Sequence, residues 1–175
     1  MTPQPLHRLV VDSPVGSLTL VASGVGLRAV LWSGDDESRV PDAAHVVDDP
    51  HPPAPVTALL ERAARQLREY FDGTRTAFDV PLDPIGSDFQ RAAWRTLQEI
   101  PHGETVSYGE QAERMGDRNK ARAVGAANGR NPIPIIVPCH RVVGSTGSLT
   151  GFAGGVETKR WLLDHERRVA GRTLL

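Results

Sequence analysis

The sequence predicts an α+β protein in which a small antiparallel sheet with one helix precedes a mainly helical half. Short β-branched runs alternate with turn residues near the start, helical periodicity dominates later, and the charge balance changes sign between the two halves. Residues 1–84 carry seven basic and twelve acidic side chains, whereas residues 85–175 carry thirteen and nine. We therefore expect two domains, 1–84 and 85–175.

The first domain is expected to contain a three-stranded antiparallel meander and one helix. The strands are predicted from the runs at residues 6–13, 17–23 and 27–32, which are separated by the turn sequences SPVGS and GVG. Apolar residues at helical spacing predict a helix over residues 56–71, and FDVPL at 78–82 predicts one more short strand.

Residues 33–55 are acidic and proline-rich without a sustained period, so they predict a loop. His45 and His51 lie in this loop and have no cysteine or carboxylate partners at metal-ligand spacing. We expect both histidines to be exposed to solvent, and the sequence predicts no metal site.

The second domain is expected to be mainly helical, with marked helix starts. SDFQ at 87–90 and SYGE at 107–110 both fit the capping-box pattern. Residues 120–129, KARAVGAANG, predict a helix of small side chains after a Gly-containing turn, so the pair of short helices resembles a helix-turn-helix. A last helix is predicted over 156–168, with Val156 among its core residues.

Composition indicates an ordinary globular protein without disulfides. The chain has 175 residues, 39% of them hydrophobic, a net charge of −1 and one cysteine. The first residues lack a signal-peptide pattern, and the apolar runs are too short for a membrane span. These features predict a cytoplasmic protein. A local basic patch indicates either a polyanion site or a solvated face, and it comprises Arg114, Arg118, Lys120, Arg122, Arg130 and Arg141.

The single cysteine, Cys139, is followed directly by His140. An imidazole that accepts the thiol proton increases the thiolate fraction, and a carboxylate from Asp164 or Glu166 could orient the imidazole. The alternative is a buried, inert cysteine, which the bare dipeptide favours. Adjacent side chains on a strand point to opposite faces, so cooperation requires irregular backbone. Three prolines can supply it: Pro132, Pro134 and Pro138.

Three more residues have both a structural and a functional interpretation. Asn131 is either an ordinary turn residue or a brace for the chain before the thiol. Arg122, the long cation between two alanines, is either a solvated surface residue or a side chain that inserts into a DNA groove. Tyr108 either anchors its helix or donates a hydrogen bond to a substrate nitrogen.

Together these segments resemble the O6-alkylguanine-DNA alkyltransferases, the methylated-DNA–protein-cysteine methyltransferase family. The resemblance rests on IPHGETVSYGEQA, KARAVGAANGRNPIPIIVPCHRVVG, LTGFAGG and KRWLLDHE, which occur in the family's order within residues 86–168. It implies a ribonuclease H-like first domain and a winged helix-turn-helix-like second domain. It also overturns the preference for an inert cysteine.

The resemblance implies DNA repair by direct damage reversal. The O6-alkyl group of O6-alkylguanine, and also the methyl group of O4-methylthymine, would pass irreversibly to Cys139 in a single turnover that needs no cofactor. Cys139 would be activated through a water molecule by His140, which Glu166 orients. Asn131 would brace the active-site segment, and Tyr108 would rotate the target phosphate and supply a proton to the departing guanine.

The resemblance also implies a DNA surface and a substrate pocket. A monomer would bind double-stranded DNA through the minor groove and flip the damaged base out, with cooperative binding left open. Arg122 would fill the vacated space. The implied DNA contacts are Arg122, Tyr108, Gly109, Ala121, Ala123, Asn128, Gly129 and Ser145. The implied pocket residues are Pro134 and Val142 together with a loop at 149–154, from which Leu149, Phe152, Ala153 and Gly154 would contribute.

Two positions depart from the family pattern, and two other functions compete with repair. Phe152 stands where the family usually has tyrosine, and Ala153 replaces a serine of some members, so two hydrogen-bonding groups are missing near the guanine. The competing functions are a non-catalytic helix-turn-helix module with an inert cysteine and a cysteine hydrolase. The module predicts that Cys139→Ser keeps every activity, and the hydrolase predicts turnover beyond one equivalent.

Overall fold

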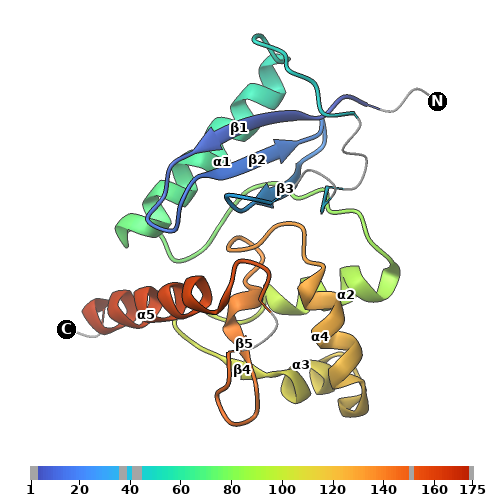
Figure 1. The fold of residues 1–175 in the computed structure, drawn as a ribbon, viewed down its shortest axis with the longest axis vertical. Coiled ribbons are helices and arrows are strands. Elements are labelled where there is room, and N and C mark those ends of the chain that lie inside the picture. The colour runs from blue at the N-terminus through green and yellow to red at the C-terminus, as the bar shows by residue number, and fades with distance from the viewer. Residues whose placement is uncertain (1–3, 36–38, 41–44, 150–151, 174–175) are drawn as a thin grey trace. The chain divides into compact units, whose positions relative to one another are not determined.

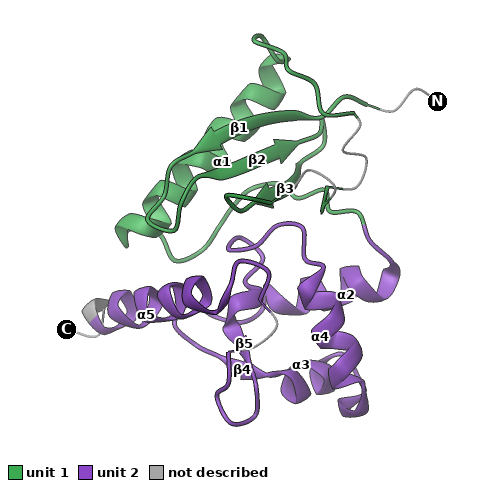
Figure 2. Ribbon diagram, in the orientation of Figure 1, with its two compact units in different colours: residues 1–85 green, residues 86–175 purple. Residues whose placement is uncertain are grey.

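The computed structural model of the chain describes residues 4–35, 39–40, 45–149 and 152–173. For residues 172 and 173 it describes the backbone alone. The chain divides into two compact units, residues 1–85 (unit 1) and 86–175 (unit 2), coloured separately in Figure 2. Each unit has its own buried apolar residues, such as Leu20 in unit 1 and Leu162 in unit 2. In the described part of the chain, no helix is long and apolar enough to cross a membrane.

Unit 1 contains the expected three-stranded antiparallel meander. Strands β1 (His7–Val11), β2 (Leu18–Ala22) and β3 (Leu27–Leu31) pair in the order β1-β2-β3. Helix α1 (Ala54–Asp72) contacts all three strands, as Figure 1 shows. The helix ends at Gly73, whose φ of 81° is the left-handed conformation that glycine adopts readily. The fold class predicted for this part of the chain is confirmed.

The fifth segment of unit 1 differs from expectation. Residues 78–82 do not form a strand, and one isolated bridge joins Leu82 to Leu27. The Pro81 carbonyl accepts from the Leu27 N–H at 2.8 Å, but proline has no N–H with which to continue a ladder. The prediction of a short strand at 78–82 is therefore wrong, for a reason visible in the sequence itself.

The long connection between β3 and α1 is more anchored than a free loop. The Leu6 N–H donates to the His45 carbonyl at 2.8 Å, and the Val47 N–H donates to the Leu6 carbonyl at 2.9 Å. His51 is exposed as expected, but His45 is half-buried. Residues 36–38 and 41–44 of this predicted loop lie outside the described residues, and the helix already begins at Ala54.

Unit 2 is mainly helical. Its elements are α2 (Asp88–Leu97), β4 (Val106–Ser107), α3 (Tyr108–Arg114), the 3₁₀ turn η3 (Arg118–Lys120), α4 (Ala121–Gly129), the 3₁₀ turn η4 (Cys139–Arg141), β5 (Val142–Val143) and α5 (Val156–Thr173). The short strands β4 and β5 pair in parallel. The capping box at Ser87 and Gln90 is confirmed by both of its hydrogen bonds.

Two expectations for unit 2 need correction. Helix α5 extends to Thr173, beyond the predicted end at residue 168, and Val156 is 42% exposed instead of packed inward. Val156 opens the helix, where the first turn has not yet reached the core, whereas Leu162 and Leu163 further along are buried. Arg141 is 6% exposed, so it does not belong to the basic surface patch in which the sequence placed it.

Candidate active site

The segment before the cysteine is a buried loop held by Asn131. Residues 131–142 are all buried. The Asn131 Nδ2 donates to the Val137 carbonyl at 2.9 Å, and its Oδ1 accepts from the Ile133 N–H at 3.0 Å. Ile135 has a φ of 72°, a left-handed conformation that β-branched residues rarely adopt. The chain around the prolines is therefore irregular, as cooperation between adjacent side chains requires.

Cys139 and His140 begin η4 and place a thiol next to a buried imidazole. Cys139 is 8% exposed and His140 is fully buried. The His140 Nε2 lies 2.6 Å from the Glu166 Oε2, whereas its Nδ1 is buried without a hydrogen-bond partner among the described residues. The imidazole is thus oriented through one nitrogen and keeps the other available.

Glu166 on α5 is the centre of a buried network. Its Oε1 accepts from the Gly103 N–H at 3.1 Å and from the Arg141 Nε at 2.9 Å, and its Oε2 accepts from the Arg141 Nη2 at 3.1 Å. The Arg141 Nη1 donates to the Ile100 carbonyl at 2.6 Å. The carboxylate is 1% exposed. Its charge is therefore balanced by a guanidinium that holds both oxygens.

These contacts determine the protonation states in the network. Burial alone would raise the pKa of Glu166, but the hydrogen bonds and charges of His140 and Arg141 outweigh it and hold this pKa well below its usual range. Burial lowers the pKa of His140, although Glu166 opposes this shift. His140 is therefore neutral near pH 7. Since Nε2 faces a carboxylate, Nε2 bears the proton and Nδ1 has the free lone pair.

Of the two carboxylates that could orient His140, the structure places Glu166 there. Asp164 is exposed, and its Oδ1 lies 3.5 Å from the Arg167 Nη1 on the outer face of α5. The two residues are separated by two positions along a helix, which turns their side chains about 200° apart. Asp164 therefore has no part in the network.

Tyr108 also lies near the thiol. It opens α3 after Ser107, whose Oγ accepts from the Glu110 N–H at 3.1 Å and caps the helix. Burial, together with the negative charge of Cys139, raises the pKa of Tyr108, so its hydroxyl remains protonated near pH 7. The ring packs beside Gly125 of α4, where an added Cβ would lie 3.6 Å from the ring.

The structure brings in two residues to which the sequence analysis gave no role in the site, Arg141 and Lys159. Lys159 is 1% exposed, and its Nζ donates to the Val142 carbonyl at 2.6 Å. Lys159 and Glu166 are seven residues apart on α5 and share its buried face with Leu162 and Leu163. Charged residues at core positions of a helix were the available signal.

The exposed face of α4 carries small and basic side chains. Arg122, Ala123 and Arg130 are exposed, and Ala121 and Gly129 are partly exposed. Beneath this face the Trp94 Nε1 on α2 donates to the Ala127 carbonyl at 2.8 Å. The helix is thus fixed from below, while small side chains and Arg122 face outward and Arg130 follows directly after its end.

Asn128, one of the expected DNA contacts, lies on the opposite face. It is 7% exposed, and its amide exchanges two hydrogen bonds with Gln111 of α3, at 3.1 and 2.8 Å. Gln111 also donates to the Ala93 carbonyl at 3.2 Å. Because both atoms of the Asn128 amide are bonded inside the unit, we assign it to the packing of α3 on α4 in place of DNA contact.

The remaining predicted residues surround Lys159 or lie on nearby turns. The Lys159 Nζ is 5.9 Å from the ring centroids of both Tyr108 and Phe152. Pro134 and Val142 are buried, Gly109, Leu149, Phe152 and Gly154 are partly exposed, and Ser145 and Ala153 are exposed. Residues 150 and 151 of the expected pocket loop lie outside the described residues.

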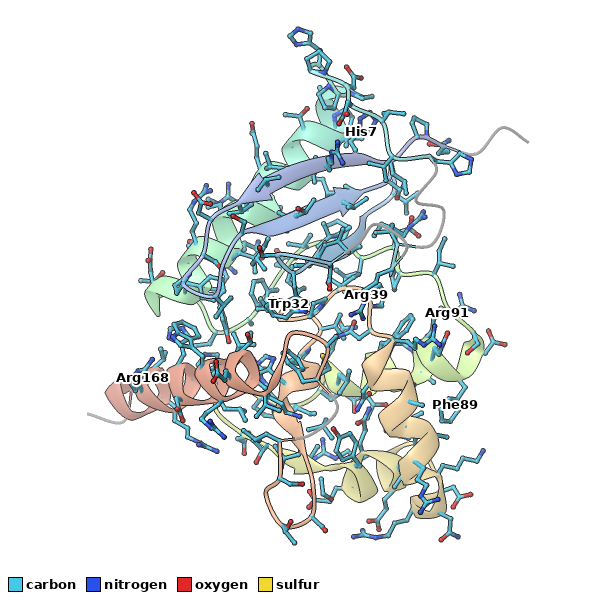
Figure 3. All side chains as sticks on the ribbon, in the orientation of Figure 1. His7, Trp32, Arg39, Phe89, Arg91 and Arg168 are labelled. Atoms are coloured by element: carbon cyan, nitrogen blue, oxygen red, sulfur yellow. The ribbon has the colours of Figure 1, made fainter. Side chains whose placement is uncertain are left out.

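A separate cavity of about 380 Å³ in unit 2 is lined by α2, α3, η3 and α4, and it includes Phe89 and Val124. The ring centroid of Phe89, which is labelled on α2 in Figure 3, lies 5.8 Å from the Lys120 Nζ. Neither Cys139 nor Glu166 lines this cavity. Among the residues that the structure describes, no group of three or more histidine, cysteine or acidic side chains could hold a metal ion.

A helix-turn-helix unit that carries an oriented base beside its thiol has the features of a nucleic-acid-binding protein with a reactive cysteine. Family models agree with this class. Residues 6–84 match the model of the 6-O-methylguanine DNA methyltransferase ribonuclease-like domain, and residues 88–168 match that of its DNA-binding domain. The chain therefore belongs to the 6-O-methylguanine DNA methyltransferase family.

Individual relatives give the same result. A methylated-DNA–protein-cysteine methyltransferase of Mycobacterium tuberculosis is 46% identical over 162 residues, 93% of each chain, and one of Methanosarcina acetivorans is 42% identical over 92% of this chain and 98% of its own. The crystal structure of M. tuberculosis O6-methylguanine methyltransferase superimposes with a TM-score of 0.81 at 45% identity, covering 93% of each chain. M. tuberculosis OGT in complex with DNA gives 0.82 at 46% identity, covering 93% of this chain and 94% of its own.

Proposed function

We propose that Cys139 is the residue that accepts the methyl group when this protein repairs O6-methylguanine in DNA. Repair by methyl transfer to a cysteine of the protein follows from the family and from relatives that are 42–48% identical over most of the chain. The chain has one cysteine, so the acceptor can only be Cys139. The observation that supports this assignment is the 2.6 Å contact between Glu166 and His140, the residue that directly follows Cys139.

The network supports thiol activation by His140. Its Nδ1 has a free lone pair and takes the Cys139 proton through a bridging water molecule, while Glu166 keeps the proton on Nε2 and stabilises the imidazolium that forms. Near pH 7 only a few per cent of an ordinary thiol is thiolate, about one part in thirty. A neutral imidazole next to the thiol increases this reactive fraction.

The transfer itself is a displacement at the alkyl carbon. The thiolate forms a new S–C bond as the bond between that carbon and guanine O6 breaks, and the electron pair passes to the guanine. Tyr108 donates its phenolic proton to the departing ring and regains a proton from the imidazolium through solvent. The product is a neutral thioether, which no nearby group hydrolyses, so each protein molecule acts once and uses no cofactor.

The surface of α4 supports binding of double-stranded DNA. The family model for this part of the chain is a DNA-binding domain, and M. tuberculosis OGT has been solved in complex with DNA. The small side chains on α4 allow close approach of the backbone, and we propose that this helix lies in the minor groove. Arg122 then fills the space of a base that has been flipped toward Cys139.

Pocket chemistry determines which adducts are accepted. Phe152 has no hydroxyl group, and Ala153 has no side-chain hydrogen-bond donor. The bound guanine would therefore receive fewer hydrogen bonds than a tyrosine and a serine at these positions would provide. We propose that the pocket also accepts O4-methylthymine. The protein acts as a monomer in the cytoplasm, and cooperative binding along DNA is compatible with this arrangement.

The decisive experiment uses duplex DNA that contains O6-methylguanine with a radiolabelled methyl group. We expect stoichiometric transfer of label to wild-type protein, location of the label on the peptide containing Cys139, and complete loss in Cys139→Ser. Label released as methanol, or turnover beyond one equivalent, would support a hydrolase. Binding of the DNA without any transfer would leave a non-catalytic helix-turn-helix module.

The role of Arg122 has its own test. We expect Arg122→Ala to slow repair of duplex DNA at least about tenfold, because base flipping costs a few kcal/mol that this side chain offsets. Reaction with free O6-benzylguanine needs no flipping and should remain within about twofold of wild type. Arg130→Ala, an exposed arginine directly after the end of α4, is the matched control for simple loss of positive charge. Equal losses on both substrates would exclude Arg122 from flipping.

A further inference from the structure

Three helices of unit 2 meet at a buried pair of amide side chains. Gln111 on α3 is fully buried, and Asn128 on α4 is 7% exposed. The Asn128 Nδ2 donates to the Gln111 Oε1 at 2.8 Å, and the Gln111 Nε2 donates to the Asn128 Oδ1 at 3.1 Å. The same Nε2 also donates to the Ala93 carbonyl of α2 at 3.2 Å. Gln111 therefore joins α3 to α2 and to α4, the two helices beside it in Figure 1.

Burying two amide groups is costlier than burying apolar side chains of the same size. Each amide gives up hydrogen bonds to water, and the bonds that replace them contribute little net stability. What a reciprocal pair adds is direction, because its hydrogen bonds form in one register of the two helices and are lost in another. The pair is therefore suited to fixing the position of α4 against α3.

The other contacts between α3 and α4 carry little directional information. Tyr108, three residues before Gln111, packs its ring beside Gly125, three residues before Asn128. Residues three apart share a helix face, so the ring contact and the amide pair belong to one interface. The remaining buried side chains of α4 are apolar. Apolar burial is non-directional, so these contacts alone do not select one register.

Helix α2 supplies a second attachment point for α4. The Trp94 Nε1 donates to the Ala127 carbonyl at 2.8 Å. A single hydrogen bond leaves a helix free to pivot about it. Ala127 and Asn128 are successive residues, which lie about 100° apart around a helix axis, so the two attachments hold α4 from different sides. Loss of the amide pair leaves the bond to Trp94 as a pivot.

We propose that Gln111 and Asn128 are positioning residues that hold the DNA-facing side of α4 in the orientation that repair requires. This inference rests on the proposed binding of α4 to DNA. A shift of α4 by one residue position would move Arg122 about 1.5 Å along the helix axis and about 100° around it. Arg122 would then miss the space that the flipped base leaves. The pair acts on repair through α4 and touches neither the alkyl group nor the thiol.

The acceptor thiol is held by separate contacts. The segment before Cys139 is braced by the Asn131 side chain, which bonds to Val137 and Ile133. The Asn131 N–H also donates to the Asn128 carbonyl at 3.1 Å, a backbone bond in which the Asn128 amide side chain takes no part. Loss of the amide pair should therefore slow repair of duplex DNA much more than reaction with a free base.

The test compares removal of one amide with removal of both. Gln111→Met leaves the Asn128 amide buried without its partner, so the urea midpoint of unfolding should fall. Gln111→Met/Asn128→Leu replaces the pair by apolar groups of similar shape, and its urea midpoint should return toward that of wild type. We expect single-turnover repair of duplex DNA containing O6-methylguanine to be about tenfold slower in both variants. Reaction with free O6-benzylguanine, which needs no flipping, should stay within about threefold of wild type.

Thr96→Val is the matched control. The Thr96 Oγ1 donates to the Ala92 carbonyl at 3.0 Å, so this change removes a hydrogen bond from the interior of unit 2 without separating two helices. It should leave both rates unchanged. If the pair served stability alone, Gln111→Met/Asn128→Leu would regain the duplex rate together with its urea midpoint. That result, or equal losses on the two substrates, would overturn the positioning role.

A second measurement uses the wild-type protein and requires no variant to fold. In ¹⁵N NMR spectra, the side-chain amide of Gln111 should exchange its hydrogens with water far more slowly than that of Gln98, which is exposed. This protection should persist when duplex DNA binds. Exchange of the Gln111 amide at the rate of Gln98, in the free or the bound protein, would show that the pair is open and would overturn the inference.

The outcomes separate this inference from the function itself. If wild-type protein takes label from methylated DNA and Gln111→Met/Asn128→Leu repairs duplex DNA equally fast, the positioning role falls while methyl transfer stands. If wild-type protein takes no label, the proposed acceptor role falls, and fluorescence anisotropy with undamaged duplex DNA still tests the pair. Weaker binding by the double variant than by wild type would support the positioning role, and equal binding would overturn it.

Discussion

Each unit of this protein contains an ion pair with little solvent exposure, partly buried in unit 1 and fully buried in unit 2, and the two pairs differ in the groups that they contact. In unit 1 the Arg28 Nη2 contacts the Asp83 Oδ2 at 2.9 Å, the Arg28 Nε donates to the Asp83 carbonyl at 2.9 Å, and Ser23 donates to the same carboxylate at 2.6 Å. In unit 2 Arg141 holds Glu166, and Glu166 in turn holds His140. The first pair fastens the chain after α1 to strand β3.

The second pair extends to reactive groups. The Asp83 carboxylate accepts hydrogen bonds from a hydroxyl and a guanidinium, and neither of these groups can act as a general base. The Glu166 carboxylate ends at an imidazole whose other nitrogen has no partner among the described residues. We therefore expect the ion pair of unit 1 to serve stability, and that of unit 2 to orient the imidazole that we propose as the base for Cys139.

The largest expected effect comes from Glu166→Gln. The change leaves Arg141 buried without its anion, so the free energy of unfolding should fall by about 3–5 kcal/mol. It also releases His140, and the rate of methyl transfer should fall about 100-fold or more. Urea unfolding and single-turnover transfer measure the two effects.

Asp83→Asn is the matched change in unit 1. Since Asp83 is partly exposed, we expect a loss of about 1–2 kcal/mol in unfolding free energy and a transfer rate within about twofold of wild type. A large loss of transfer in Asp83→Asn, or an unchanged rate in Glu166→Gln, would show that the two ion pairs do not differ in function.

Arg141→Met tests how the network keeps His140 neutral. The positive charge of Arg141 lowers the pKa of His140, so its removal should raise that pKa. A larger fraction of His140 is then protonated near pH 7, and the reaction with free O6-benzylguanine should require higher pH, by about one unit. A pH–rate profile identical to that of wild type, in a protein that still folds, would contradict this role.

Stability should fall as the pH is lowered, beginning near pH 6.5. The pKa values of His140 and His102 are lowered by burial, so below about 6.5 the unfolded chain binds protons that the folded chain does not. The pKa of Glu166 is also lowered, which adds a further loss below about pH 4.5. Urea midpoints at several pH values measure both steps, and a midpoint independent of pH from 7 to 4 would contradict the assignment.

The smallest expected effect is that of Asp164→Asn. Asp164 forms an exposed contact with Arg167, and exposed ion pairs contribute about 0–1 kcal/mol. We expect a change in unfolding free energy within about 0.5 kcal/mol and no change in transfer rate. A loss comparable to that of Glu166→Gln would mean that the wrong carboxylate has been assigned to His140.

Much of the fold was predictable because it depends on local patterns. The meander follows from alternating runs and turn residues, and the start of α2 follows from Ser87 and Gln90. The predicted strand at 78–82 did not form because the prediction rested on the strand propensity of the side chains. That propensity takes no account of the backbone N–H that Pro81 lacks. The inward position of Val156 failed because helical spacing does not say where along a helix the core begins.

The candidate site was only partly accessible to such reasoning. The sequence alone determined that this protein has one thiol, that His140 follows it, and that two carboxylates on a later helix could orient the imidazole. The tertiary structure decided the rest. It selected Glu166 over Asp164, moved Arg141 from the surface into the network, turned Asn128 inward, and placed Lys159 beside the aromatic rings. The physical reason is that burial and distance between remote segments set the charge state of each group, and linear spacing contains neither quantity.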